Sequence, residues 1–204
     1  MNSSGIELET KFLVRDLTKC EKRLQELGAR LVQLRQFERN LRYDLPGGSL
    51  KKAYKVLRLR QDQNAVLTYK GPGSKLQGGI RAREEWEVTV SDFEVMRKIL
   101  ESLGYDILFI YEKYRTTYAL DKTEVMLDEL PFGFFVEIEG GNQSDVLTLA
   151  EDLHLNRETA IPDSYQVEFE KVKSSLNLSF RDLTFENFKG IKVPVSALGV
   201  MYSD

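Results

Sequence analysis

Charged and apolar residues alternate at every second position in several short segments of the chain. In the segment Ile6–Phe12, the side chains of Glu7, Glu9 and Lys11 share one face of an extended strand, and apolar side chains share the other face. The same alternation occurs over residues 56–60, 66–70, 83–88, 113–115 and 136–139. So many half-buried strands predict an antiparallel sheet.

Three other segments have the apolar spacing of helices. Asp16 is expected to cap a helix that stops at Gly28, and Ser91–Glu94 form a capping box before a helix that stops at Gly104. A third helix is expected to begin after Ser144. We interpret the apolar stripes as core faces rather than cofactor-binding surfaces. Because a Glu-x-Glu strand precedes each helix, the chain resembles a pseudo-repeated α+β domain.

Two segments lack this regularity. Residues 71–79 contain too many glycines for a strand, so we predict a mobile loop that joins two strands. The loop lacks the glycine and lysine spacing of a Walker phosphate loop. Residues 171–204 are expected to be a C-terminal extension of unclear role, either dependent on a partner or loosely attached, after a domain that spans residues 1–170.

Composition excludes several classes of function. The 204 residues are 42% apolar, enough for a substantial core, and the net charge of −3 gives no basic face for nucleic acid. A single cysteine, Cys20, and a single histidine, His154, argue against a disulfide framework, a Cys/His zinc site and histidine-dependent hydrolase chemistry. No apolar run approaches the ~20 residues of a membrane span, and the first nine residues lack signal-peptide features. We therefore expect a cytoplasmic protein without membrane or nucleic-acid partners.

The charges on the predicted strands fall into like-charged pairs. Three pairs are acidic and three are basic, namely Glu7/Glu9, Glu85/Glu87 and Glu137/Glu139, and Arg58/Arg60, Arg81/Arg83 and Lys113/Arg115. Residues two apart on a strand are ~7 Å apart, where repulsion is ~0.6 kcal/mol in water but ~2.4 kcal/mol at an effective dielectric constant of 20. The pairs are either solvated strand faces or the lining of a closed barrel, in which carboxylates bind divalent cations and basic groups bind phosphoryl oxygens.

Two predicted hairpins favour convergence of these groups. A turn over residues 130–134 would bring Asp128 near Glu137, beside Glu139. A two-residue turn at 121–122 would place Arg115 opposite Asp128. A cation and a carboxylate suited to a metal would then meet across neighbouring strands.

The ordered set of strand motifs resembles the CYTH superfamily of triphosphate tunnel enzymes, which includes class IV adenylyl cyclases and thiamine triphosphatases. The resemblance covers residues 6–170 and is carried by the E-x-E-x-K motif at 7–11 and the motifs at 57–60, 67–72, 83–87, 113–115, 127–128 and 135–139. Ser164-Tyr165 is similar to a short motif of the cyclase branch. The resemblance implies an α+β fold with a closed eight-stranded antiparallel barrel and helices packed outside it.

The resemblance also implies a site. Its phosphate-binding cations would be Lys11, Arg58, Arg60, Lys70, Arg83, Lys113 and Arg115. Its ligands for Mg²⁺ or Mn²⁺ would be Glu7, Glu9, Asp128, Glu137 and Glu139. Glu85 and Glu87 are the candidate catalytic carboxylates, without assignment of a single general base.

The expected activity is that of a class IV adenylyl cyclase, which converts ATP into cyclic AMP and pyrophosphate. The alternatives are a triphosphatase acting on inorganic triphosphate, thiamine triphosphate or a nucleoside triphosphate, and a non-catalytic polyphosphate-binding module. The expected partner is a small-molecule triphosphate, and formation of a homodimer is left open.

Overall fold

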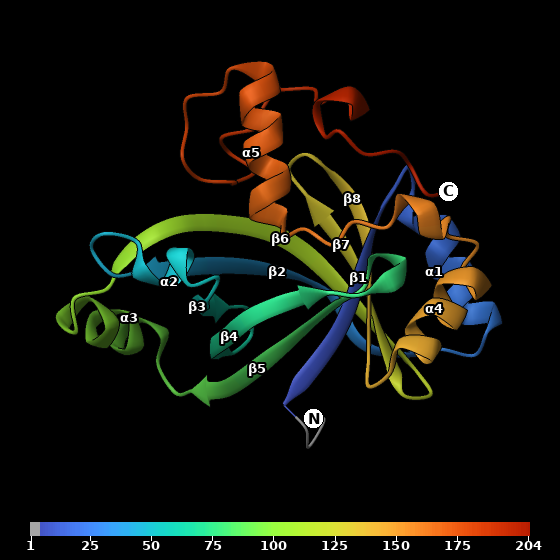
Figure 1. Ribbon diagram of the computed structural model, residues 1–204, viewed down its shortest axis with the longest axis horizontal. Coiled ribbons are helices and arrows are strands. Elements are labelled where there is room, and N and C mark those ends of the chain that lie inside the picture. The colour runs from blue at the N-terminus through green and yellow to red at the C-terminus, as the bar shows by residue number, and fades with distance from the viewer. Residues whose placement is uncertain (1–4) are drawn as a thin grey trace.

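Eight antiparallel strands close into a barrel in the computed structural model, which describes residues 5–204 (Figure 1). The order of neighbouring strands is β1-β5-β4-β3-β2-β6-β7-β8, and β8 pairs with β1 to close the barrel. The strands are β1 Ile6–Val14, β2 Arg30–Asp44, β3 Val56–Gln61, β4 Ala65–Lys75, β5 Arg81–Val90, β6 Asp106–Leu120, β7 Thr123–Leu130 and β8 Gly133–Gly140. The predicted fold class is confirmed.

Helices pack against the outside of the barrel (Figure 1). The α-helices are α1 Leu17–Glu26, α2 Ser49–Lys52, α3 Phe93–Ser102, α4 Gln143–Asp152 and α5 Tyr165–Leu176, and the 3₁₀ helices are η1 Gln77–Gly79, η2 Arg157–Thr159 and η3 Val195–Ala197. α1 and α4 share one apolar core with β1 and β8, α3 covers a second core, and α5 belongs to a third. Across residues 5–204, no helix combines the length and apolar character needed to cross a membrane.

The predicted helix starts are correct to within two residues. Asp16 caps α1, since its carboxylate accepts the Thr18 N–H at 2.8 Å. α3 is capped by Asp92, whose carboxylate accepts the Val95 N–H at 2.9 Å, rather than by Ser91. Asn142 caps α4, which therefore begins before Ser144. In each case a side-chain oxygen satisfies a backbone N–H that the first helical turn leaves free.

The first half of the glycine-rich segment, residues 71–75, is strand and not the loop that we predicted, and the second half does join two strands. β4 continues to Lys75 and pairs with β5 after a register shift between Lys70 and Gly73, so the connection shortens to residues 76–80. A Cβ atom at Gly73 would lie 3.4 Å from the backbone carbonyl oxygen of Ala82 on β5 and 2.6 Å from the Arg81 Nε. Glycine here allows close approach of a neighbouring strand at an irregular point in the ladder.

The segment after Tyr165 is also more ordered than predicted. It begins with α5, and the C-terminal segment 177–204 then packs Leu183, Phe188 and Leu198 into the same core as Phe169 of α5. The backbone of Leu183 forms two hydrogen bonds with β6 at 2.9 Å, one to the Ile110 carbonyl and one from the Glu112 N–H. The expectation of loose attachment is therefore wrong.

Candidate active site

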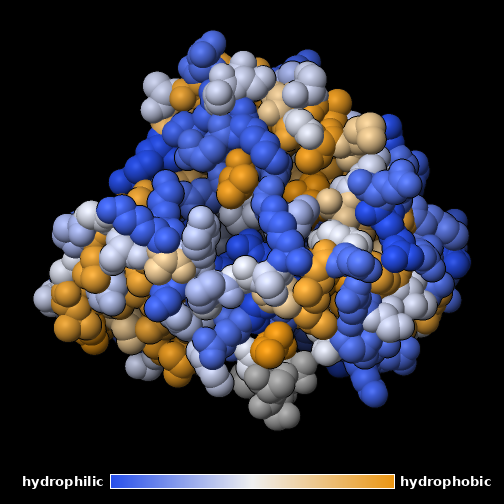
Figure 2. Space-filling model, viewed as in Figure 1, coloured by the Kyte–Doolittle hydropathy of each residue, from blue (hydrophilic) through white to orange (hydrophobic). Residues whose placement is uncertain are grey.

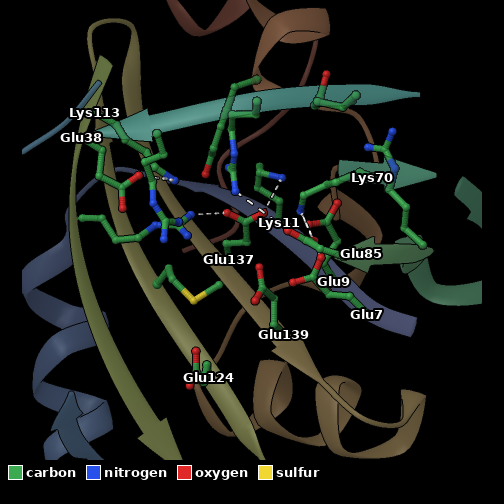
Figure 3. A pocket seen from close by; sticks show the side chains of 18 of the residues that line it. Glu7, Glu9, Lys11, Glu38, Lys70, Glu85, Lys113, Glu124, Glu137 and Glu139 are labelled. Atoms are coloured by element: carbon green, nitrogen blue, oxygen red, sulfur yellow. Dashed lines mark hydrogen bonds and ion pairs between the residues drawn. The ribbon is translucent and has the colours of Figure 1, made fainter. Parts of the chain in front are cut away.

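The barrel encloses a cavity of about 290 Å³ that is lined mostly by ionic side chains (Figure 3). All eight strands contribute to this lumen. Its acidic residues are Glu7, Glu9, Glu38, Glu85, Glu87, Glu124, Glu137 and Glu139, and its basic residues are Lys11, Arg42, Arg58, Arg60, Lys70, Arg81, Arg83, Lys113 and Arg115. The charged strand faces therefore point inward, as one of the two interpretations of the like-charged pairs required.

Three carboxylates converge on one wall of the lumen. Glu7 and Glu9 of β1 and Glu139 of β8 each offer an oxygen, and these oxygens all lie within 4.8 Å of one another. The strand register accounts for this proximity, because Glu9 and Glu139 are directly opposite in the β1–β8 ladder. We call these three residues the carboxylate cluster. A donor set made only of carboxylate oxygens suits a hard divalent cation such as Mg²⁺ or Mn²⁺.

The protonation of this wall also suits a divalent cation. Burial opposes ionisation of Glu7, but Lys70 and hydrogen bonds from Glu85 and Glu139 lower the pKa of Glu7 to about 2. Burial and the hydrogen bond to Glu7 raise the pKa of Glu85 to about 8. Burial and repulsion from Glu7 and Glu137 hold the pKa of Glu139 well above its ordinary value. Protons thus take the place that a divalent cation would fill when it binds these oxygens.

Asp128 and Glu137, predicted as metal ligands, lie outside the carboxylate cluster. The Arg115 guanidinium donates to both oxygens of Asp128 at 2.6 Å and to Glu137 at 2.6 Å. Glu137 also pairs with Lys11 at 3.2 Å, and the Tyr165 hydroxyl donates to Asp128 at 2.7 Å. The predicted pairing of Arg115 with Asp128 is present in the β6–β7 ladder. In this structure these two carboxylates fix the positions of basic side chains.

All seven predicted phosphate-binding cations line the lumen. Most are held by carboxylates, as in the pairs of Lys70 with Glu7 and of Arg58 with Glu87, both at 3.1 Å. Arg83 is held differently, because its guanidinium donates to the backbone carbonyls of Gly71 at 2.6 Å and Tyr54 at 3.0 Å. Fixed cations in an enclosed space are preorganised to bind phosphoryl oxygens.

The two candidate catalytic carboxylates differ in protonation. Glu87 accepts hydrogen bonds from the Thr68 hydroxyl at 2.7 Å and from Arg58. Burial opposes its ionisation, but these contacts lower the pKa of Glu87. Glu85 contacts Lys70 and retains a proton near neutral pH. Of the pair, Glu85 is therefore the one placed to exchange a proton.

Several lumen residues escaped the sequence analysis. Glu38 and Arg42 of β2 alternate at strand spacing, but their charges are opposite, so they do not form a like-charged pair. Glu38 is 2% exposed and lies 3.6 Å from the Lys113 ammonium. Burial opposes ionisation of Glu38, but Lys113 and nearby arginines lower its pKa to about 2. Their spacing at even-numbered positions of one strand, which places both side chains on the same face, was the only signal that could have identified them.

Comparisons with known proteins agree with the barrel. A protein of Methanocaldococcus jannaschii named "putative adenylate cyclase" is 28% identical over 171 residues, which cover 78% of this chain and 96% of that protein. A solved structure from Vibrio parahaemolyticus with the same name has a TM-score of 0.72 at 20% identity and covers 79% of this chain and 96% of its own.

A Hippeastrum protein, described as a putative adenylyl cyclase with a dominant triphosphatase activity, has a TM-score of 0.57 at 18% identity, over 80% of this chain and 95% of its own. At these identities the solved structures establish the fold. The sequence model of the CYTH domain matches residues 5–168, which include all eight strands of the barrel and the start of α5. The chain therefore belongs to the CYTH domain family.

Proposed function

We propose that this protein is a divalent-metal-dependent adenylyl cyclase that converts ATP into cyclic AMP and pyrophosphate. The observation that carries the proposal is the carboxylate cluster, which faces fixed cations inside one closed lumen. In a metal complex of a triphosphate, the metal ion would neutralise the carboxylates and the phosphate groups would neutralise the cations. The Methanocaldococcus jannaschii relative, matched over nearly its whole length, supports the cyclase activity in particular.

Glu7, Glu9 and Glu139 would hold the metal ion. When bound, Mg²⁺ or Mn²⁺ supplies neutralisation of phosphate charge and acidification of an attacking hydroxyl. Lys11, Arg58 and Lys70 bind phosphate oxygens and stabilise the negative charge that accumulates during transfer. Glu85 lies at the edge of the cluster, and its pKa of about 8 without a metal ion shows that it binds a proton readily, so it could exchange a proton with the reacting hydroxyl or the pyrophosphate.

Hydrolysis of a triphosphate is the second candidate. The same cations and carboxylates serve when water attacks the terminal phosphorus in place of the ribose hydroxyl. The lumen favours this alternative in one respect, because Val32, Val56, Met126, Tyr111 and Tyr165 are the only apolar or aromatic side chains among its described lining. They offer little surface to a purine base compared with the ionic groups.

Product analysis tests both candidates. The protein is incubated with ATP or inorganic triphosphate in the presence of Mg²⁺ or Mn²⁺, and the products are resolved chromatographically. Cyclic AMP with pyrophosphate supports the cyclase, whereas orthophosphate supports the triphosphatase. Binding without turnover would contradict both and leave a polyphosphate-binding module. Glu139→Gln should be inactive, and Glu84→Gln, an exposed glutamate beside Glu85 on β5, is the matched control.

A further inference from the structure

Arg42 is a half-buried cation in the lumen, and its Nε atom is buried. It lies on β2, and its guanidinium donates a hydrogen bond to the neutral side-chain carbonyl of Gln166, on the first turn of α5. The Arg42 Nε has no hydrogen-bond partner, and no ion pair to Arg42 occurs among residues 5–204. Its charge is therefore not balanced by an ion pair within the described part of the chain.

Neighbouring groups make this imbalance larger. Burial is the main cause that lowers the pKa of Arg42; attraction by Tyr111 opposes it, and repulsion from Arg58 and Arg81 adds to it. Most other basic groups in the lumen differ, since residues such as Lys11, Lys70 and Arg115 each contact a carboxylate. Arg83 also lacks a carboxylate, but two backbone carbonyls accept its hydrogen bonds. A guanidinium with a buried, unpartnered nitrogen is costly unless an anion completes its contacts.

The position of Arg42 indicates which anion this is. Around the closed barrel, three strands separate β1 from β2 in either direction, so Arg42 lies on the wall opposite Glu7 and Glu9. A phosphate group held by a metal ion at the carboxylate cluster would leave the far end of a longer phosphate chain pointing across the lumen. Arg42 is an unpaired cation on that far wall.

We propose that Arg42 binds a phosphate oxygen of the substrate at the end remote from the carboxylate cluster, and that Gln166 occupies the guanidinium only until substrate displaces it. This inference rests on the proposed function and extends it: Arg42 makes the site selective for triphosphates over diphosphates. Gln166 is then a placeholder, meaning that it accepts the Arg42 hydrogen bond while the lumen holds no substrate and releases it when substrate binds.

Calorimetric binding of inorganic triphosphate and of pyrophosphate, each with Mn²⁺, tests the inference. Arg42→Gln should weaken triphosphate binding by about 10- to 100-fold, the loss of one charged hydrogen bond, and leave pyrophosphate binding nearly unchanged. Arg42→Lys should show an intermediate loss, and Gln166→Ala should bind triphosphate at least as tightly as the wild type. Arg39→Gln is the matched control, because Arg39 lies on the same strand but is exposed.

The outcomes separate this inference from the function on which it rests. Wild-type protein that binds neither phosphate with Mn²⁺ would overturn the proposed function and the role of Arg42 with it. Wild-type binding that Arg42→Gln leaves unchanged, or weakens equally for both phosphates, would overturn the role of Arg42 alone. Circular dichroism verifies that each variant is folded. If Arg42→Gln does not fold, Gln166→Ala still tests the inference. Weaker triphosphate binding by Gln166→Ala would contradict the role of Gln166 as a placeholder.

Discussion

Two glutamates on β8 show how the surroundings of a residue decide its role. Glu137 and Glu139 are two residues apart and both point into the lumen. Glu137 pairs with Lys11 and Arg115, which hold its pKa well below the ordinary value despite burial. Glu139 faces Glu7 instead, and its pKa is raised. One glutamate therefore stabilises the metal-free barrel, and the other is free to accept a metal ion.

This difference predicts opposite effects of the same substitution. Glu137→Gln should lower the free energy of unfolding by about 3 kcal/mol, because it leaves two buried cations without their partner. Glu139→Gln should leave it unchanged or raise it, since a neutral amide replaces a protonated acid. Urea unfolding at pH 7 without metal measures both values, and equal losses in the two variants would argue against this division of roles.

The low pKa of Glu38 predicts how the free energy of unfolding depends on pH. Its folded-state pKa of about 2 lies below the ordinary value of 4.5, so its stabilising effect is present above pH 4.5 and is lost as the pH falls towards 2. The shift corresponds to about 3 kcal/mol. Glu38→Gln should therefore be less stable than the wild type at pH 7, and the difference should shrink between pH 5 and pH 2. A difference that stays constant with pH in urea titrations would contradict the assignment.

Some contacts of single residues could be predicted from the sequence and others could not. The turn at 121–122 was short enough to define the register, so Arg115 was correctly placed opposite Asp128. The full set of hydrogen bonds to Asp128 was not predictable. One of its donors is the Tyr165 hydroxyl, which is distant along the chain. Strand spacing indicates which face a carboxylate occupies, but not which groups reach it from elsewhere.

At the scale of elements, regular periodicity made the strands and most helices predictable. The exceptions were segments that tertiary contacts stabilise. β4 extends through its glycines because they fit against β5, and segment 177–204 packs apolar residues into the core without a helical or strand repeat. Periodicity carries no signal for either arrangement, since both depend on partners far along the chain.

The C-terminal segment should contribute to the stability of the whole barrel. Leu183 is fully buried and its backbone is bonded to β6, so Leu183→Ala should lower the free energy of unfolding by about 2–5 kcal/mol. Glu186→Ala, an exposed change three residues away, is the control and should have little effect. Denaturant unfolding measures both variants. Equal stability of the two would show that the segment is not part of the cooperative unit.

For the whole molecule, closure of the barrel turns a pattern of charges into a binding site. Like charges on one strand cost little in water but repel strongly in an enclosed lumen. The structure offsets part of this cost with ion pairs and with protons on Glu85 and Glu139, and leaves Arg42 unpaired. Figure 2 shows hydrophilic side chains visible in the hollow near the centre of the face viewed. A metal ion and a polyphosphate would complete the balance together.

Mn²⁺ affinity, measured with and without inorganic triphosphate, tests this claim most directly. Because the two ligands carry opposite charges and would lie in one lumen, triphosphate should tighten Mn²⁺ binding by about 10-fold or more, and Mn²⁺ should tighten triphosphate binding by the same factor. Glu139→Gln should abolish the coupling. Mn²⁺ binding that is indifferent to triphosphate, or unchanged in Glu139→Gln, would contradict the account.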